Sequence, residues 1–341
     1  MSVTLEADRL APYRRFSLYN SPYVAHVDGS AVDLYPPPEA HTIPSPVAGE
    51  VLDVHTVRAP PQPYAEHEDH LILVDTGTHV ARLMHVEPEV EPGDVIGRGD
   101  ALGRPVRAGF FAPWVPVHLH LEFRPYDVDP VRASGSIRLD IAVDVRALTW
   151  DGTGTVVESG ETWARLDSPE HPDPGGGFAG VAAVGTGAGD AGRGDERRWT
   201  PGPVLDGGVP HYPGGGLLGR YDGDGESGDD DREVGEVGDD GSGRVTVGDD
   251  DRGDGDRGDG DRGDGDRGDG DPETVRLGGE RVGTVDGRDV AWDDFDVLAN
   301  GDRVRGIACY ADRAETGVKL VGQNVDLSVG ESVTVEICQR G

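Results

Sequence analysis

A tract rich in aspartate and glycine interrupts this chain of 341 residues at residues 222–272. The tract holds 21 acidic residues and six arginines, and it repeats Arg-Gly-Asp-Gly-Asp with a period of five from Arg252 to Asp271. Glycine at this density and an excess of one charge leave too little apolar surface to offset chain entropy, so we expect a disordered segment. Any packed structure must form from the residues before and after the tract.

The rest of the chain is also acidic. The whole chain carries a net charge of −34 and the tract carries −15, so the remaining residues carry −19. This charge argues against a nucleic-acid binder with a broad basic surface and against attraction to anionic membranes. An acidic chain whose single lysine is Lys319 is typical of a protein that stays soluble at molar salt, where a Debye length of about 3 Å screens carboxylate repulsion.

Signals for targeting and for disulfides are few. No run of 18 apolar residues occurs, so no transmembrane helix is expected. The first residues, MSVTLEADRLAPYRRF, are acidic where a signal peptide needs an apolar stretch, so we expect a cytoplasmic protein. Cys309 and Cys338 are the two cysteines, which excludes a disulfide scaffold and a cysteine-type zinc site.

Short apolar runs between Gly, Pro and Asp residues predict an all-β chain. They occur throughout residues 15–165 and again in 274–341, and no 12-residue helical period interrupts them. We predict a β-sandwich or barrel domain and a small second β domain, with the insert between the two halves of the second. The predicted parts are residues 15–134 for the first domain, 135–221 and 273–341 for the halves of the second, and 222–272 for the insert.

The histidines concentrate in the first half of the chain, where nine of the 11 lie between His26 and His120. The segment VHLHLEF predicts a strand on which His118, His120 and Glu122 share one face. Two imidazoles on one strand face can hold a single Zn²⁺, which takes histidine nitrogen and carboxylate oxygen in a tetrahedral shell. Taken alone, the pattern also fits an exposed polar strand face.

Four further segments precede VHLHLEF in a fixed order. His26 and Asp33 lie on either side of a glycine turn. The remaining three segments are PSPVAGEV at 44–51, ARLMHV at 81–86 and VEPGDVIGRGDALG at 90–103. Pieces of this kind also occur in lipoyl and biotinyl domains, but residues 1–318 contain no lysine that could carry such a group. The order of all five segments is therefore the informative observation.

In that order the segments resemble the lysostaphin-like zinc peptidases, the glycylglycine endopeptidase family, over about residues 20–126. The resemblance implies a duplicated hybrid-motif β fold and a Zn²⁺ ion bound by His26, Asp33 and His120. It also implies that His85 and His118 are unliganded catalytic histidines, which polarise the zinc-bound water and stabilise the oxyanion. Six residues separate His26 from Asp33, where the family has three.

Two functions follow from these expectations. The first is a zinc metalloendopeptidase that hydrolyses amide bonds of short or Gly-rich peptides, with esterase or amidase chemistry as a variant. The second is a catalytically weak or inactive peptidase-like module that binds a partner. Retention of His85 and His118 favours the enzyme, whereas the missing signal peptide favours the module. We expect the other histidines to face solvent, with His67 and His70 in an acidic loop that ends at Asp69; the full set is His41, His55, His67, His70, His79, His171 and His211.

Deleting residues 222–272 is expected to leave the melting temperature at molar salt nearly unchanged, because the tract has little apolar surface to bury. Thermal melts of the full chain and of the deletion variant in the same buffer test this expectation. A fall of more than a few degrees in the variant contradicts it.

Overall fold

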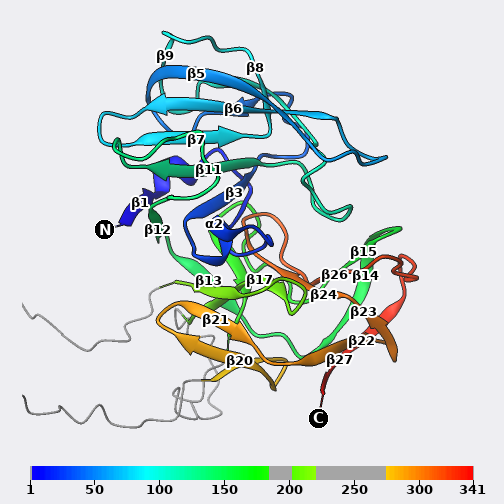
Figure 1. Cartoon of the computed structure of the whole chain (residues 1–341). Helices are drawn as coiled ribbons and strands as arrows, with labels where there is room; N and C mark the ends of the chain where they lie inside the picture. The colour runs from blue at the N-terminus through cyan, green and yellow to red at the C-terminus, as the bar shows by residue number, and fades with distance from the viewer. Residues whose placement is uncertain (1, 184–201, 220–273, 341) are drawn as a thin grey trace, which may run out of the picture. The chain divides into compact units, whose positions relative to one another are not determined.

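The structure is a computed structural model that describes residues 2–183, 202–219 and 274–340. Within these residues it has 27 strands and two helices of four residues each. The prediction of an all-β chain is confirmed (Figure 1). The predicted disordered insert at 222–272 lies outside the described residues.

The first part of the chain contains the elements β1 (Ser2–Glu6), α1 (Ala7–Leu10), β2 (Arg15–Ser17), α2 (Val24–Val27), β3 (Ala31–Tyr35), β4 (Ile43–Pro44), β5 (Gly49–Arg58), β6 (Glu68–Asp75), β7 (Val80–Met84), β8 (Val86–Pro88), β9 (Val95–Ile96), β10 (Ala101–Pro105) and β11 (Leu119–Arg124). The later strands are β12 (Arg138–Ala142), β13 (Val145–Leu148), β14 (Thr153–Gly160), β15 (Trp163–Leu166), β16 (Phe178–Val181), β17 (Val204–Val209), β18 (Gly215–Leu218), β19 (Thr274–Leu277), β20 (Glu280–Asp286), β21 (Asp289–Trp292), β22 (Phe295–Ala299), β23 (Asp302–Val304), β24 (Gly306–Cys309), β25 (Ala311–Asp312), β26 (Lys319–Val321) and β27 (Ser332–Gln339).

A curled sheet of ten strands contains most of the first part, in the order β13-β16-β25-β2-β3-β11-β7-β6-β5-β9. Strands β5, β6, β7 and β11 run side by side in Figure 1. Three strands that follow residue 134 in the chain, β13, β16 and β25, extend this sheet beyond β2. In addition, β1 pairs with β12 in parallel. These pairings join strands that lie on both sides of the predicted domain boundary at residue 134. The boundary itself stays a prediction.

A second sheet of twelve strands contains only later strands, in the order β19-β20-β21-β18-β17-β24-β26-β15-β14-β27-β22-β23. Strands that precede residue 220 and strands that follow residue 273 alternate in it, as in the pairs β17–β24 and β14–β27. Chain segments on both sides of the predicted insert therefore share one hydrogen-bonded sheet.

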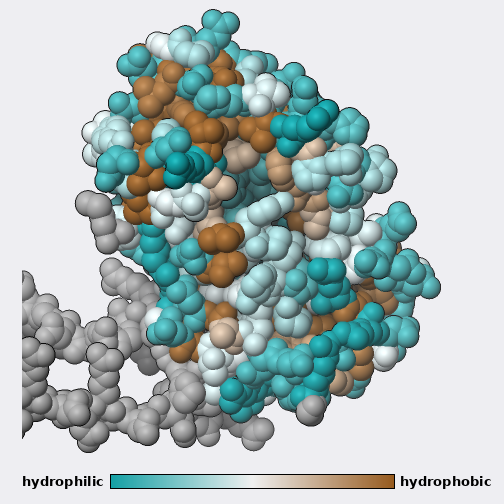
Figure 2. Space-filling view, viewed as in Figure 1, coloured by the Kyte–Doolittle hydropathy of each residue, from teal (hydrophilic) through white to brown (hydrophobic). Residues whose placement is uncertain are grey.

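Two large clusters of buried apolar side chains form the core, one mainly under each sheet, and Val204 and Leu218 of the second sheet belong to the first cluster. The alternation of β11 explains one side of the first cluster, because Leu119, Leu121 and Phe123 all point into it. Figure 2 shows hydrophobic residues gathered over β5, β6 and β7, whereas the surface over β20, β22 and β27 is mostly hydrophilic. Among the described residues, no helix is long and apolar enough to cross a membrane.

Candidate metal centre

Three of the predicted site residues meet at the junction of α2, β3 and β11. Strands β3 and β11 are antiparallel with His120 directly opposite Asp33, a register that places the two side chains on the same face. His26 comes from α2, and Gly29 then turns the chain into β3 with φ +60°. A Cβ at Gly29 would lie 2.6 Å from the Tyr19 hydroxyl oxygen, so the turn requires glycine. The six residues between His26 and Asp33 are thus the last residue of a helix, a tight turn and the first two residues of β3.

The candidate ligand atoms of His26, Asp33 and His120 form a nearly equilateral triangle. Asp33 Oδ1 lies 3.2 Å from His26 Nε2 and 3.0 Å from His120 Nδ1, and the two nitrogens are 3.1 Å apart. A tetrahedral zinc shell with bonds of about 2.0–2.1 Å separates its ligand atoms by about 3.3 Å. The triangle therefore has almost the size that such a shell needs. All three side chains are buried.

The second nitrogen of each imidazole has a hydrogen-bond acceptor of its own. His26 Nδ1 donates to the Leu18 carbonyl oxygen at 2.5 Å, and His120 Nε2 donates to Glu122 Oε1 at 2.7 Å. These tautomers are assigned from their acceptors, and they leave lone pairs on the two nitrogens that face Asp33. That arrangement holds for neutral rings; a protonated His120 instead donates from Nδ1 to Asp33 Oδ1 at 3.0 Å. A metal cation at this point would displace that proton and contact all three atoms.

The Glu122 carboxylate is held in its ionised form. Its Oε2 accepts a hydrogen bond from the Ser136 hydroxyl and lies 2.9 Å from Arg124 Nη1. Burial raises the pKa of Glu122, but the hydrogen bond from His120 and the nearby Arg82 outweigh it and hold the pKa well below its ordinary value. A carboxylate behind a ligating histidine fixes the ring and increases its basicity.

The electrostatics of the cluster favour positive charge. Burial lowers the pKa of His120, but its hydrogen bonds with Asp33 and Glu122 outweigh burial and raise the pKa to about 9. Burial also raises the pKa of Asp33, yet the facing His118 and His26 lower it well below its ordinary value. The site is thus built to neutralise a positive charge with two carboxylates.

His118 lies just before β11, beside the triangle. Its Nδ1 donates to the Pro116 carbonyl oxygen at 2.9 Å, which leaves the lone pair on Nε2, 3.4 Å from Asp33 Oδ1. The Phe111 ring stacks on the imidazole at 4.4 Å between centroids and 16° between planes. Burial lowers the pKa of His118 to about 4, so the ring is a neutral proton acceptor.

His85 lies between β7 and β8 in the left-handed backbone region, with φ 70°. A non-glycine residue in this region costs about 1–3 kcal/mol, and such residues cluster at functional sites. The fully buried Asp69 holds His85 in place: Oδ2 accepts from Nδ1 at 2.6 Å, and Oδ1 accepts from the backbone N–H at 3.1 Å. The ring centroid lies 5.1 Å from that of His118, so both rings face the same space.

Two sequence expectations about neighbouring residues are wrong. Asp69 does not end an acidic loop but lies buried in β6, because this strand begins at Glu68. His171 does not face solvent; it is buried and accepts a hydrogen bond from the backbone N–H of Asp173 at 3.1 Å. The partnership of Asp69 with His85 leaves no mark in the local sequence pattern, since it depends on the pairing of β6 with β7.

A large cleft opens over the cluster. Its volume is about 1000 Å³, and all five predicted site residues line it: His26, Asp33, His85, His118 and His120. Sites for small molecules and peptides are typically concave and mostly apolar, with a few converging polar groups. The polar groups of this cleft are concentrated on its floor, so the cleft matches that description.

Changing Glu122 to glutamine is expected to weaken metal binding about 10- to 100-fold, because the carboxylate that orients His120 loses its charge. Metal titrations of the wild type and the variant measure this loss. The matched control is Glu87→Gln, which changes an exposed carboxylate on β8 that pairs with Arg104. Equal affinities in the wild type and Glu122→Gln would contradict the expected role of Glu122.

The fold and the site together define an all-β protein with a buried His–Asp–His cluster at the floor of a cleft. One family model, described as the N-terminal domain of a domain of unknown function (DUF8155), matches residues 4–141, and the corresponding C-terminal domain model matches residues 146–338. The chain belongs to this family. Searches of curated proteins and of solved structures each found no match. All five predicted site residues lie within the N-terminal match.

Proposed function

We propose that the protein is a zinc-dependent hydrolase of peptide amide bonds, in which His26, Asp33 and His120 bind Zn²⁺. One observation carries the proposal: His26 Nε2, His120 Nδ1 and Asp33 Oδ1 face one another at 3.0–3.2 Å in a buried cluster. The ordered resemblance of residues 20–126 to lysostaphin-like zinc peptidases supports the same assignment.

The donor set favours zinc over the common hard cations. Two nitrogens and one oxygen suit Zn²⁺ and other first-row transition metals, whereas Mg²⁺ and Ca²⁺ prefer oxygen ligands. Three protein ligands also leave a fourth tetrahedral position for water or substrate. The site thus has the composition of a catalytic centre.

The bound metal would supply an activated water, whose pKa zinc lowers toward about 7. His118 presents a neutral Nε2 beside Asp33 and is placed to accept a proton. His85 has its Nδ1 hydrogen directed at Asp69, so its Nε2 is the nitrogen left for the cleft. In this assignment one histidine takes up a proton and the other, in its protonated form, stabilises negative charge on the substrate oxygen.

A binding or structural module is the second candidate. His118 Nε2 lies only 3.4 Å from Asp33 Oδ1, close enough that a small shift of the ring would make it a fourth ligand. Four protein ligands close a zinc site and leave no position for water. This alternative has the same metal but no hydrolysis.

Metal analysis of the full chain, followed by digestion of a peptide library, tests the proposal. We expect one zinc per chain and cleavage that stops when a chelator removes the metal. One zinc without cleavage of any peptide would favour the module. A chain that binds no zinc at micromolar free metal would overturn the proposal.

A further inference from the structure

The walls of the cleft are apolar, in contrast to its polar floor. Four side chains form what we call the aromatic wall: Tyr64 and Phe110, which are partly exposed, and Phe111 and Trp114, which are buried behind them except for a small exposed area. Burial of apolar area contributes about 25 cal/mol per Å², so such a wall favours a ligand with a large apolar side chain. A substrate made only of glycine has no side chain to place there.

The aromatic wall is held rigidly in place. The Tyr64 hydroxyl donates to the Phe111 carbonyl oxygen at 3.0 Å, and Lys319 Nζ donates to the Trp114 carbonyl oxygen at 2.6 Å. Arg107 donates to three more backbone carbonyls of the same loop. Because these contacts fix the wall before a ligand arrives, little ordering entropy is lost on binding.

The acidic excess of the chain does not extend into the cleft. Of the described residues that line it, only Asp33 and Glu122 are carboxylates, and both hydrogen-bond to His120. The lining cations are Arg82, which lies 3.8 Å from Glu122, and Arg305. Arg305 is therefore the cation of the cleft lining that is not tied to the metal centre.

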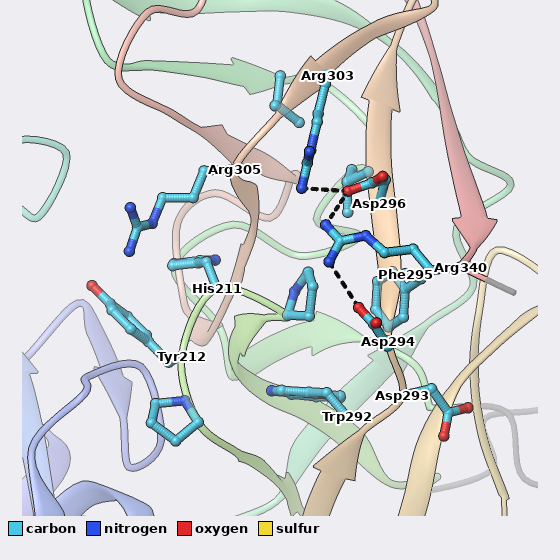
Figure 3. Close-up of a pocket in the computed structure, with 14 residues that line it drawn as sticks. His211, Tyr212, Trp292, Asp293, Asp294, Phe295, Asp296, Arg303, Arg305 and Arg340 are labelled. Carbon is cyan, nitrogen blue, oxygen red and sulfur yellow. Dashed lines mark hydrogen bonds and ion pairs between the residues drawn. The ribbon is translucent and has the colours of Figure 1, made fainter.

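Arg305 differs from the arginines beside it. In a neighbouring cavity of about 480 Å³, Arg303 lies 2.6 Å from Asp296, and Arg340 lies 2.8 Å from Asp294. Figure 3 shows these ion pairs as dashed lines, with Arg305 apart from them. Within the described part of the chain, no carboxylate lies within ion-pair distance of Arg305, and its side chain is exposed. A free guanidinium is a bidentate partner for a carboxylate.

The position of Arg305 connects it to the site. It lines both cavities, together with His211 and Tyr212, and its Cζ lies 5.4 Å from the centre of the Trp114 ring. Both Arg305 and Asp33 act electrostatically on the Tyr212 hydroxyl: burial raises the pKa of Tyr212 to about 12, Arg305 lowers it and Asp33 raises it. Arg305 thus lies at the end of the aromatic wall, on the same cleft as the metal centre.

We propose that the cleft binds the carboxyl end of a peptide, with a bulky apolar side chain on the aromatic wall and the terminal carboxylate at Arg305. The peptide nature of this ligand rests on the proposed function. The recognition itself rests on the apolar lining, the unpaired guanidinium and the absence of other free charges among the described lining residues. The substrate class then differs from the Gly-rich peptides expected from the resemblance.

Three matched peptides test this proposal by calorimetric titration of the full chain: acetyl-Gly-Gly-Leu-Leu with a free carboxylate, the same peptide as its amide, and acetyl-Gly-Gly-Gly-Gly with a free carboxylate. We expect the first to bind at least about tenfold more tightly than either of the others, a difference of about 1.4 kcal/mol. Arg305→Gln should remove the preference for the carboxylate and keep the preference for leucine. Circular dichroism verifies that the variant is folded.

Arg303→Gln is the matched control, because Arg303 lines only the neighbouring cavity. It should keep both preferences. Equal binding of acid and amide by the wild type, or equal losses in the two variants, would overturn the proposal. Mass spectrometry of the recovered peptides separates this result from the proposed function: selective binding without cleavage refutes only hydrolysis, whereas cleavage without selectivity refutes only the recognition at Arg305.

Discussion

His120→Ala is expected to abolish zinc binding, whereas His118→Ala is expected to keep about one zinc per chain and lose hydrolysis. The two residues are two positions apart in the sequence, but only His120 belongs to the triangle of candidate ligand atoms. Loss of a ligand removes binding energy that also stabilises the fold, so the melting temperature of His120→Ala should fall as well. Metal content, melting temperature and cleavage rate are measured on both variants.

His85→Ala supplies the second half of this comparison. It should keep the metal and lose hydrolysis, because His85 contacts Asp69 and not the candidate ligands by hydrogen bonds. The opposite pattern, with metal lost in His118→Ala and kept in His120→Ala, would show that the two roles are reversed. Metal loss in both would indicate a site closed by four ligands.

Asp206→Ala is expected to lower both the stability and the metal affinity, although Asp206 lies in β17 of the second sheet. Its carboxylate accepts hydrogen bonds from the Ser17 hydroxyl at 2.5 Å and from the backbone N–H groups of Leu18 and Tyr19 at 2.6 and 3.2 Å. The Leu18 carbonyl in turn accepts from His26. The Asp206→Ala variant leaves these three hydrogen-bond donors without an acceptor. At about 1 kcal/mol or more for each donor, we expect the free energy of unfolding to fall by about 3 kcal/mol or more.

Asp206→Asn is the matched variant, because a rotated amide can still accept from the two backbone groups and donate to Ser17. It should keep most of the stability and of the metal affinity, whereas Asp206→Ala should bind zinc about tenfold more weakly. Denaturant unfolding and zinc titration measure both quantities. Loss of stability without any change in zinc affinity would limit Asp206 to a structural role.

The pH dependence gives Asp206 a further signature. Burial raises the pKa of Asp206 from an ordinary value of 3.8 to about 6 in the folded protein. Between these two values the folded state binds more protons than the unfolded state, so this group makes the free energy of unfolding fall as the pH rises from about 4 to about 6. Asp206→Asn should remove that part of the slope.

The sequence was sufficient for those features that depend on local periodicity. Alternation along VHLHLEF predicted that Leu119 and Leu121 face the core and that His120 and Glu122 face the other side, and the structure places them so. The all-β character followed from short apolar runs. The grouping of His26 and Asp33 with His120 came from the ordered motifs, because the helix end, the turn and the strand start between His26 and Asp33 do not show in the sequence that the two side chains meet.

The supporting groups were beyond the reach of the sequence for a physical reason. Asp69, Leu18 and Asp206 act through strand register and through contacts between segments that lie up to 189 residues apart. A backbone carbonyl such as that of Leu18 carries no residue-specific signal at all. Burial of a single aspartate is also invisible in a chain with 65 acidic residues.

The pairing of β2 with β25 determines how this protein can be divided. Arg15 and Phe16 pair with Asp312 and Ala311, near the other end of the chain. A fragment that ended at residue 141, where the N-terminal family match ends, would contain every candidate ligand but would expose the edge of β2. Exposed strand edges recruit other chains, so such a fragment would associate with itself instead of reporting on the metal centre. Residues 311–312, which are synthesised after nearly all of the chain, thus complete the sheet that carries the candidate ligands Asp33 and His120.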